Sequence, residues 1–322
     1  MKSIVKKAIL KTFGPPVRYV ISQMQLHEPI NKRLNILESI LQDAYPAHWI
    51  VNERSRGNIE YIIKNQNLPA NIDTEISKND LMFRYFILNG FSIPDAMKAY
   101  FERSLHFLDI LEKTSEKLWG KEWKTQALPM LDFASGYGAF ERLLVHHLDK
   151  DGIYTSDIKK QAVDFQVNKF GVKGIYSTFV PEDFESPVLF KSIFVGSLFS
   201  HLPQDLFGRW LKKLIALTDK NGVLIFSVHD QSLGNTQKDF VYNDISEDSA
   251  MGLVEDSITN AAAYGTSFVS EKFVADCFQQ MGFSAENYQR YPKLFCGLQD
   301  VYIFTHQKNV LNGKIAFANY LG

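Results

Sequence analysis

The chain has 322 residues, of which 45% are hydrophobic and 22% are charged, a composition typical of a folded globular protein and not of a disordered one. The formal net charge of −1 argues against a globally basic nucleic-acid-binding protein, so we expect no nucleic-acid partner. Cys277 and Cys296 are too few for a disulfide framework or a four-cysteine zinc site, and they indicate a reducing, cytoplasmic location.

The first residues of the chain form a short basic, amphipathic segment. Lys2, Lys6, Lys7 and Lys11 interrupt its apolar residues, which argues against a secretory signal peptide. The pattern predicts a helix packed on the body of the protein. The alternative for such a segment is peripheral attachment to an anionic surface, here the inner face of a membrane.

Residues 1–120 have apolar residues at helical spacing and predict a helical N-terminal region. Shorter helices are predicted over residues 33–41, 58–65 and 76–89. A longer helix is predicted to begin after Ser92, where a serine cap is followed by an early proline and by Asp95, and to end near Leu118. We expect this region to cover the site, to bind substrate or to mediate a homodimer.

After residue 121, short apolar runs alternate with segments of helical length, which predicts a parallel sheet with helices on both faces. The predicted strands are 128–133, 152–156, 174–179, 192–196 and 222–228, and the predicted helices are 139–148, 160–170 and 203–218. A helix capped by Ser270 and two more strands, near 285–291 and 301–305, follow. The second predicted domain spans residues 121–308, and residues 309–322 form a C-terminal tail.

The segment from Leu131 to Glu141 reads L-D-F-A-S-G-Y-G-A-F-E and places a glycine loop between a strand and a helix. Gly136 and Gly138 let a ligand approach bare backbone, and the start of the next helix presents amides to a negative group. Roughly twenty residues later, Asp157 ends the next strand, the offset expected of a carboxylate that binds ribose hydroxyls. These features predict a nucleoside-containing cofactor.

The spacing of the loop distinguishes between such cofactors. Glu141 stands where the dinucleotide fingerprint G-x-G-x-x-G/A has its third small residue, and a carboxylate there would oppose a pyrophosphate. The sequence also lacks the phosphate-binding motif G-x-x-x-x-G-K-[ST]. S-adenosylmethionine has no phosphates and carries a sulfonium cation, which suits a looser loop with an acidic or aromatic lining.

Four motifs in register resemble those of the class I S-adenosylmethionine-dependent methyltransferases: L-D-F-A-S-G-Y-G, Ser156-Asp157, F-V-G-S-L-F-S-H-L-P and N-G-V-L-I-F-S. The resemblance spans residues 128–305. It implies an α/β fold with a Rossmann-like, seven-stranded methyltransferase sheet whose last strand is antiparallel, joined here to a helical N-terminal region. It also implies an enzyme that uses S-adenosyl-L-methionine.

A narrower resemblance concerns the acceptor of the methyl group. The stretches S-L-F-S-H-L-P, W-L-K-K-L, N-G-V-L-I-F-S-V-H-D, Y-G-T-S-F-V-S and Q-D-V-Y resemble methyltransferases encoded among enzymes of glycan and polysaccharide assembly. The resemblance implies O-methylation of a sugar or glycan hydroxyl. The alternatives are a natural-product or other small-molecule methyltransferase and a non-catalytic binding protein with this fold. A nicotinamide-dependent oxidoreductase is disfavoured by Glu141.

The resemblance also assigns cofactor contacts residue by residue. It places Asp132, Ser135, Gly136 and Gly138 at the methionine end, Asp157 at the ribose, and Thr178 and Phe179 near the adenine, and it adds Ser197 from the fourth-strand motif. The structural alternatives are a tight turn for the glycines and a helix N-cap for Asp157.

A hydroxyl acceptor must lose a proton, and a histidine is the natural general base near neutral pH. His201 follows the fourth strand, at the carboxyl end of the sheet where sites of open α/β folds lie, and is the first candidate. His229 and Asp230 end the fifth strand and are further catalytic candidates, because an aspartate can orient an imidazole. The alternative for His201 is a helix-start residue bonded to backbone.

Substrate contacts are expected from two other segments. Tyr100 and Arg103 lie on the long helix before the sheet, where an aromatic ring would cover the sulfonium, and ordinary helix core is their alternative. Residues 231–267 form a long polar insertion, typical of a lid or a disordered segment, from which Tyr242 and Tyr264 are expected to stack on a sugar. No clustered set of acidic side chains predicts a metal site.

Overall fold

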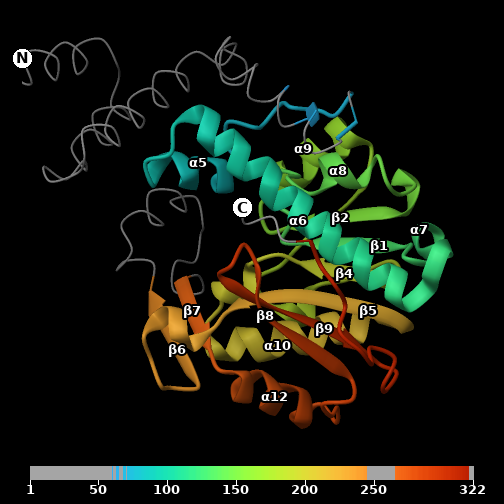
Figure 1. Ribbon diagram of the computed structural model, residues 1–322, viewed down its shortest axis with the longest axis vertical. Coiled ribbons are helices and arrows are strands. Elements are labelled where there is room, and N and C mark those ends of the chain that lie inside the picture. Colours follow the sequence, from blue (N-terminus) through green and yellow to red (C-terminus); the bar gives the residue numbers. More distant parts are fainter. Residues whose placement is uncertain (1–59, 61–62, 65–67, 70, 245–264, 319–322) are drawn as a thin grey trace, which may run out of the picture.

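The computed structural model describes residues 60, 63–64, 68–69, 71–244 and 265–318 (Figure 1). The basic N-terminal segment, the helix predicted over 33–41, most of that predicted over 58–65, and Tyr264 lie outside the described residues. Within the described part of the chain, no helix combines the length and the apolar character needed to cross a bilayer.

A seven-stranded sheet forms the centre of the molecule, with the strand order β3-β2-β1-β4-β5-β9-β8. Its strands are β1 (Met130–Phe133), β2 (Ile153–Asp157), β3 (Lys173–Tyr176), β4 (Phe190–Val195), β5 (Thr218–His229), β8 (Tyr288–Phe295) and β9 (Gln299–Thr305). β9 runs antiparallel to β5 and β8, while β3, β2, β1, β4 and β5 pair in parallel. The fold prediction, a Rossmann-like sheet with an antiparallel last strand and a helical region before it, is confirmed.

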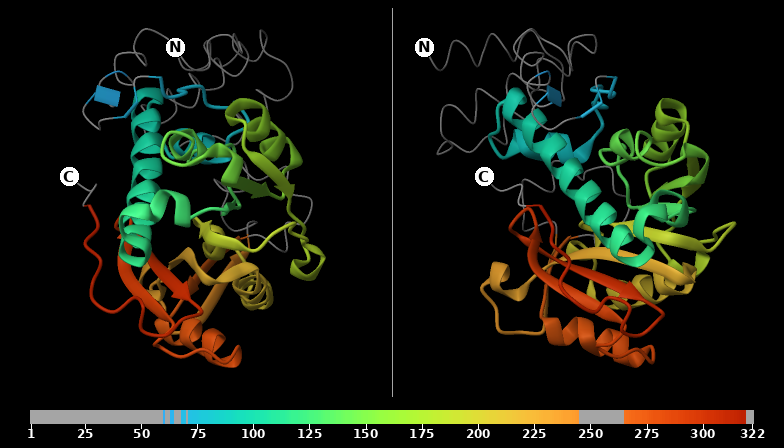
Figure 2. Two further views of the ribbon diagram at one scale, coloured as in Figure 1. Left: turned by 90° about the vertical axis from the view of Figure 1, so that its right-hand side faces the viewer. Right: turned by 45° about the vertical axis from the view of Figure 1, so that its right-hand side comes forward.

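Helices cover both faces of this sheet. The α-helices are α5 (Leu81–Leu88), α6 (Ile93–Trp119), α7 (Trp123–Gln126), α8 (Glu141–Leu144), α9 (Lys160–Phe170), α10 (Gln204–Leu217) and α12 (Glu271–Gln280). Short 3-10 turns are η2 (Gly120–Glu122), η3 (Lys150–Gly152), η4 (Pro181–Asp183), η5 (Leu198–Ser200) and η6 (Gln231–Gly234). One apolar core lies between the sheet and α5, α6 and α8, and a second lies under α10 and α12. These two groups of helices lie on opposite faces of the sheet (Figures 1 and 2).

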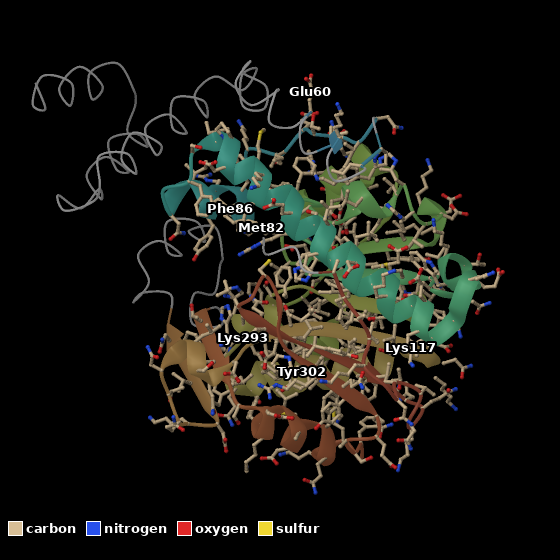
Figure 3. All side chains as sticks on the ribbon, in the orientation of Figure 1. Glu60, Met82, Phe86, Lys117, Lys293 and Tyr302 are labelled. Atoms are coloured by element: carbon tan, nitrogen blue, oxygen red, sulfur yellow. The ribbon has the colours of Figure 1, made fainter. Side chains whose placement is uncertain are left out.

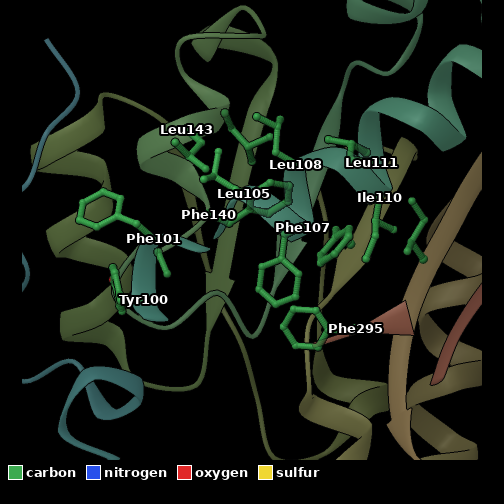
Figure 4. Close-up of a cluster of buried hydrophobic side chains, with 14 of the residues drawn as sticks. Tyr100, Phe101, Leu105, Phe107, Leu108, Ile110, Leu111, Phe140, Leu143 and Phe295 are labelled. Carbon is green, nitrogen blue, oxygen red and sulfur yellow. The ribbon is translucent and has the colours of Figure 1, made fainter. Parts of the chain in front are cut away.

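The long helix α6 joins the N-terminal region to the sheet through aromatic packing. Phe107 stacks on Phe295 with ring centroids 4.3 Å apart, and it also contacts Phe140 and Phe194 (Figure 4). The helix begins as the sequence predicts, because the Ser92 hydroxyl accepts a hydrogen bond from the Asp95 amide. The division at residue 120 remains a prediction, since α6 belongs to the same core as the sheet.

The insertion after β5 differs from the expected loop. It contains β6 (Phe240–Asp244) and β7 (Gly265–Val269), which pair antiparallel in a small second sheet. The helix predicted over 139–148 is also shorter than expected, because the amide of His146 bonds three residues back to Leu143 and the segment tightens into turns. The helix predicted over 76–89 begins only at Leu81, after the cap formed by Asp80.

Candidate active site

A cavity of about 430 Å³ lies at the carboxyl ends of the parallel strands. Its lining comes from the loops after β1, β2, β3 and β4, from the end of β5, and from α5, α6, β7 and the β8–β9 turn. The volume falls in the range of small-molecule sites, roughly 300–1,000 Å³. The position is the one expected for ligands of open α/β sheets.

The glycine loop forms the wall of the cavity next to β1. Gly136 and Gly138 have positive φ angles of 59° and 75°, a left-handed conformation that favours glycine. A Cβ atom on Gly138 would lie 2.5 Å from a ring carbon of Phe170, so α9 leaves no room for a side chain there. A Cβ atom on Gly136 would meet nothing within 4 Å. Gly138 is therefore needed for packing, and Gly136 leaves bare backbone at the cavity.

Gln166, which sequence reasoning missed, locks this loop in place. Its side chain on α9 is fully buried, and its amide donates to the Gly136 carbonyl at 2.7 Å and to the Ser135 hydroxyl at 2.9 Å. Its own carbonyl accepts from the Thr155 hydroxyl on β2 at 2.6 Å. The predicted contact Ser135 thus lines the cavity while its hydroxyl belongs to the network that fixes the loop.

Asp157 ends β2 and places its carboxylate at the loop, as the sequence predicts. The Gly136 amide donates to one carboxylate oxygen at 2.9 Å, and the Lys159 amide donates to the other at 2.8 Å. Burial raises the pKa of Asp157, and these two amides oppose that rise. Each carboxylate oxygen can accept a further hydrogen bond, so Asp157 can still bind two hydroxyls from the cavity side.

Asp132 does not line the cavity, which corrects its expected place beside the cofactor. Its carboxyl group lies buried against that of Glu141, beneath the glycine loop. Burial, followed by the neighbouring charge of Glu141, raises the pKa of Asp132 well above its usual range, and burial raises the pKa of Glu141 to about 7. Glu141 therefore faces Asp132, and the expectation that it would oppose a bound pyrophosphate is wrong.

Asp80, a second carboxylate in the cavity, was missed because only its cap signal is visible in the sequence. It caps α5 by accepting from the Phe83 amide at 2.9 Å, and it accepts from the Tyr100 hydroxyl at 2.7 Å. Tyr100 is fully buried outside the cavity, so it supports Asp80 and does not itself meet a ligand. The helix-core alternative holds for Tyr100.

Arg142 ties the chain before α5 to the glycine loop. Its buried guanidinium donates to the carbonyls of Asp73 and Glu75, at 2.9 and 3.2 Å, and its Nε donates to the Gly138 carbonyl. These hydrogen bonds hold residues 71–80, which include Asp80, beside the glycine loop.

The third strand contributes a rim to the same end of the cavity. Thr178 and Phe179 line it, as predicted, and the Phe179 ring is 37% exposed. The Thr178 hydroxyl donates to the Val180 carbonyl at 2.7 Å, which holds this turn. An exposed ring at the end of β3 suits stacking against a planar base.

A chain of hydrogen bonds crosses the far end of the cavity, from β4 to β5 and β9. The Ser227 hydroxyl donates to the Gln299 carbonyl at 2.6 Å, and the Ser197 hydroxyl donates to the same oxygen at 3.2 Å. The Gln299 amide then lies 3.2 Å from Nε2 of His229. Because that amide can only donate, the network assigns the proton of the neutral His229 ring to Nδ1. Burial lowers the pKa of His229 to about 4.

His201 lines the cavity beside His229, with ring centroids 6.3 Å apart. Its Nδ1 lies 2.8 Å from the Gly265 carbonyl, and the Gly265 amide donates to the His201 carbonyl at 2.9 Å. A carbonyl oxygen can only accept, so Nδ1 carries the hydrogen and Nε2 is the basic nitrogen of the neutral ring. The contact with backbone, anticipated as the structural alternative, sets the tautomer that a general base requires.

Asp230 does not orient either histidine, which corrects the third catalytic expectation. Its carboxylate accepts from the Ser232 amide at 2.9 Å and from the Arg290 guanidinium at 3.1 Å, and Arg290 also binds Asp300 and Glu271. Asp230 lies outside the lining of the cavity. Gln299 takes the place beside His229 that was expected of Asp230.

Arg103 lines the cavity as expected, whereas Tyr242 does not. The Arg103 guanidinium carbon lies 5.0 Å from the centre of the Phe86 ring and 5.8 Å from that of Phe295. Tyr242 lies on β6, opposite Ser267 of β7. In the residues that the structure describes, no group of three or more His, Cys, Asp or Glu side chains is arranged to hold a metal ion.

No family model matches the chain, and no curated protein matches it in sequence. Among solved structures, the sugar N-methyltransferase KedS8 from Streptoalloteichus is 10% identical over 64% of this chain and 88% of its own, with a TM-score of 0.46. DesVI from Streptomyces venezuelae is 9% identical over 72% and 99%, with a TM-score of 0.47. Magnesium protoporphyrin IX methyltransferase from Synechocystis is 13% identical over 83% and 98%, with a TM-score of 0.43. Such values carry no argument about activity.

Proposed function

We propose that this chain is an S-adenosylmethionine-dependent O-methyltransferase whose favoured acceptor is a hydroxyl of a sugar or glycan. One observation carries the proposal. A single cavity joins a bare glycine loop and the carboxylate of Asp157 to His201, a histidine whose tautomer leaves Nε2 basic. The loop and Asp157 suit a nucleoside, and His201 suits the removal of a hydroxyl proton.

The residues at the glycine loop fit S-adenosylmethionine better than a dinucleotide. Asp157 offers two oxygens to ribose hydroxyls, and the open space over Gly136 admits a ligand against the backbone. Burial, and after it the charges of Asp157 and Asp80, raises the pKa of Tyr137, the middle residue of the loop, so both carboxylates lie close to it. These two carboxylates outnumber Lys159, the described cationic side chain that lines this end, so this end would repel a pyrophosphate and attract the cationic groups of S-adenosylmethionine.

The bound cofactor supplies an activated methyl group on a sulfonium leaving group, and the protein must position and deprotonate the acceptor. Nε2 of His201 takes the hydroxyl proton, while the Gly265 carbonyl stabilises the imidazolium that forms at Nδ1. His229 is already hydrogen-bonded to Gln299 through its basic nitrogen, so it helps to position the acceptor and does not take its proton. Such general-base catalysis typically contributes a factor of about 10²–10⁴.

The rest of the lining suits a sugar. Tyr85 adds an aromatic ring to the cavity, and a ring of this kind packs against the apolar face of a pyranose. Ser197, which the sequence predicts at the cofactor, lies with Gln299 at the histidine end, where the two add a hydroxyl and an amide for sugar hydroxyls.

Calorimetric titration with S-adenosylhomocysteine, with NAD as the comparison ligand, tests the cofactor. We expect the first to bind and the second not to bind. In Asp157→Asn the affinity for S-adenosylhomocysteine should fall by roughly 1.5–3 kcal/mol, because a charged hydrogen-bond partner is lost. Asp183→Asn, which neutralises an exposed carboxylate outside the cavity, is the matched control and should bind as the wild type does. Binding of NAD alone, or equal affinities in the two variants, would contradict the assignment.

A further inference from the structure

The two ends of the cavity differ in charge. Among the described residues that line it, the carboxylates are Asp80 and Asp157, and both lie at the glycine loop, where Lys159 beside Asp157 is the cationic side chain. The histidine end has His201, His229 and the guanidinium of Arg103. Burial, followed by the charges of His201 and then Arg103, lowers the pKa of His229, in keeping with the place of all three side chains in one lining.

Arg103 is held in a fixed orientation without an acidic partner. Phe86 and Phe295 contact its guanidinium, in a cation–π arrangement. Burial raises the pKa of the Cys296 thiol and the charge of Arg103 opposes that rise, so Cys296 lies close to Arg103. No described carboxylate forms an ion pair with Arg103, whereas Arg209 pairs with Glu182 and Asp205.

We propose that the acceptor carries a carboxylate or phosphate group and that Arg103 binds this group at the histidine end of the cavity. The inference rests on the proposed methyltransferase function and narrows its substrate to an acidic acceptor, such as an acidic or phosphorylated sugar. The rigid fork of a guanidinium matches both anions with two parallel hydrogen bonds. The flanking rings restrict the side chain before binding, so less conformational entropy is lost when the anion binds.

The same anion would assist the proton transfer. When His201 accepts a proton it becomes cationic, next to His229 and near Arg103, with no described carboxylate lining that end. Like charges in a partly buried site oppose that protonation. A negative group on the acceptor, bound to Arg103, offsets this repulsion during turnover. An acidic acceptor therefore suits both the guanidinium of Arg103, which has no described ion-pair partner, and the chemistry at His201.

The test compares acidic and neutral sugars on the complex with S-adenosylhomocysteine. Calorimetric titrations use D-glucuronate, D-glucose 6-phosphate and D-glucose on the wild type, Arg103→Gln, Arg103→Lys and Lys98→Gln. Lys98 lies on the same helix with its side chain 58% exposed and outside the cavity, so its variant controls for loss of one positive charge from α6.

We expect the wild type and Lys98→Gln to bind at least one acidic sugar more tightly than glucose, by about ten- to hundredfold. Arg103→Gln should lose that preference and Arg103→Lys should keep part of it, while the affinity for S-adenosylhomocysteine stays the same in all four proteins. That unchanged affinity also shows that the variants are folded.

Two results would overturn the inference. The first is equal binding, or no binding, of acidic and neutral sugars to the wild type. The second is a loss of S-adenosylhomocysteine affinity in Arg103→Gln with no change for 5′-methylthioadenosine, which lacks the amino-acid carboxylate; Arg103 would then bind the cofactor. A wild type that binds no S-adenosylhomocysteine would instead refute the proposed function itself, before any sugar is added.

Discussion

The two ends of the cavity are built from different kinds of contact. At the glycine-loop end the binding surface is mostly main chain, fixed by Gln166 and by the carboxylate of Asp157. At the histidine end the binding groups are side chains, and each is positioned by a partner far along the chain. His201 depends on Gly265 and His229 depends on Gln299.

This difference predicts how each end responds to substitution. A main-chain surface cannot be altered without moving the loop, so changes at the glycine-loop end should affect stability and cofactor binding together. A side chain at the histidine end can be replaced with the backbone intact, so changes there should affect turnover or the choice of acceptor alone. The predictions below separate the two ends on this criterion.

The largest effect is expected at the histidine end, in His201→Gln. Glutamine keeps a side chain of similar reach but cannot accept the hydroxyl proton, so turnover should fall by about 10²–10⁴-fold with S-adenosylhomocysteine affinity unchanged. Single-turnover transfer of a radiolabelled methyl group measures the first quantity and calorimetry the second. His146→Gln, at an exposed histidine outside the cavity, should retain wild-type turnover. Full activity in His201→Gln would remove His201 from the role of base.

The glycine-loop end should show the opposite response, in Gly138→Ala. The added methyl group meets Phe170, and the alanine must also adopt a left-handed backbone conformation. The free energy of unfolding should therefore fall by about 2–5 kcal/mol, and the affinity for the cofactor should fall as well. Gly136→Ala imposes only the backbone strain, about 1–2 kcal/mol, because its methyl group has open space. Urea denaturation measures both. Equal losses in the two variants would mean that contact with α9 does not set the loop.

The sequence predicted those parts of the fold that depend on neighbours in the chain. The serines at positions 92 and 270 cap α6 and α12 as expected, and α9 has the predicted bounds of residues 160–170. The glycine loop and Asp157 were found for the same reason, because a strand, a turn and a helix follow one another directly. Periodicity and caps act over a few residues, and so they are visible without the tertiary structure.

The parts that were missed depend on contacts between distant segments. Asp230 and Gln299 look equally suited to orient a histidine, and only the packing of β8 shows that Arg290 engages the aspartate. The position of Tyr100 on its helix is compatible with either a lid over the cofactor or the helix core. Its burial and its hydrogen bond to Asp80 show that it belongs to the core. The pairing of β6 with β7 was missed because it joins two segments that lie apart in the sequence, and local patterns do not show strand pairing.

The smallest effect is expected beneath the glycine loop, from the pH dependence of stability. Burial raises the pKa of Glu141 to about 7, so between the unfolded value of 4.5 and 7 the folded protein holds a proton that the unfolded chain lacks. This contribution to stability is fully present below pH 4.5, is lost as the pH rises from 4.5 to about 7 and levels off above that, with a loss of about 1 kcal/mol between pH 6 and pH 8. Urea denaturation at the two pH values measures it.

Glu141→Gln stays neutral throughout and should flatten the difference in stability between the two pH values, whereas Glu185→Gln, at an exposed carboxylate, should leave that difference as in the wild type. If the wild type and Glu141→Gln lose the same stability, the buried carboxyl pair with Asp132 does not control the loop end. Cofactor binding would then be expected to depend on pH through Asp80 or Asp157 instead, because burial raises the pKa of both carboxylates in the cavity itself.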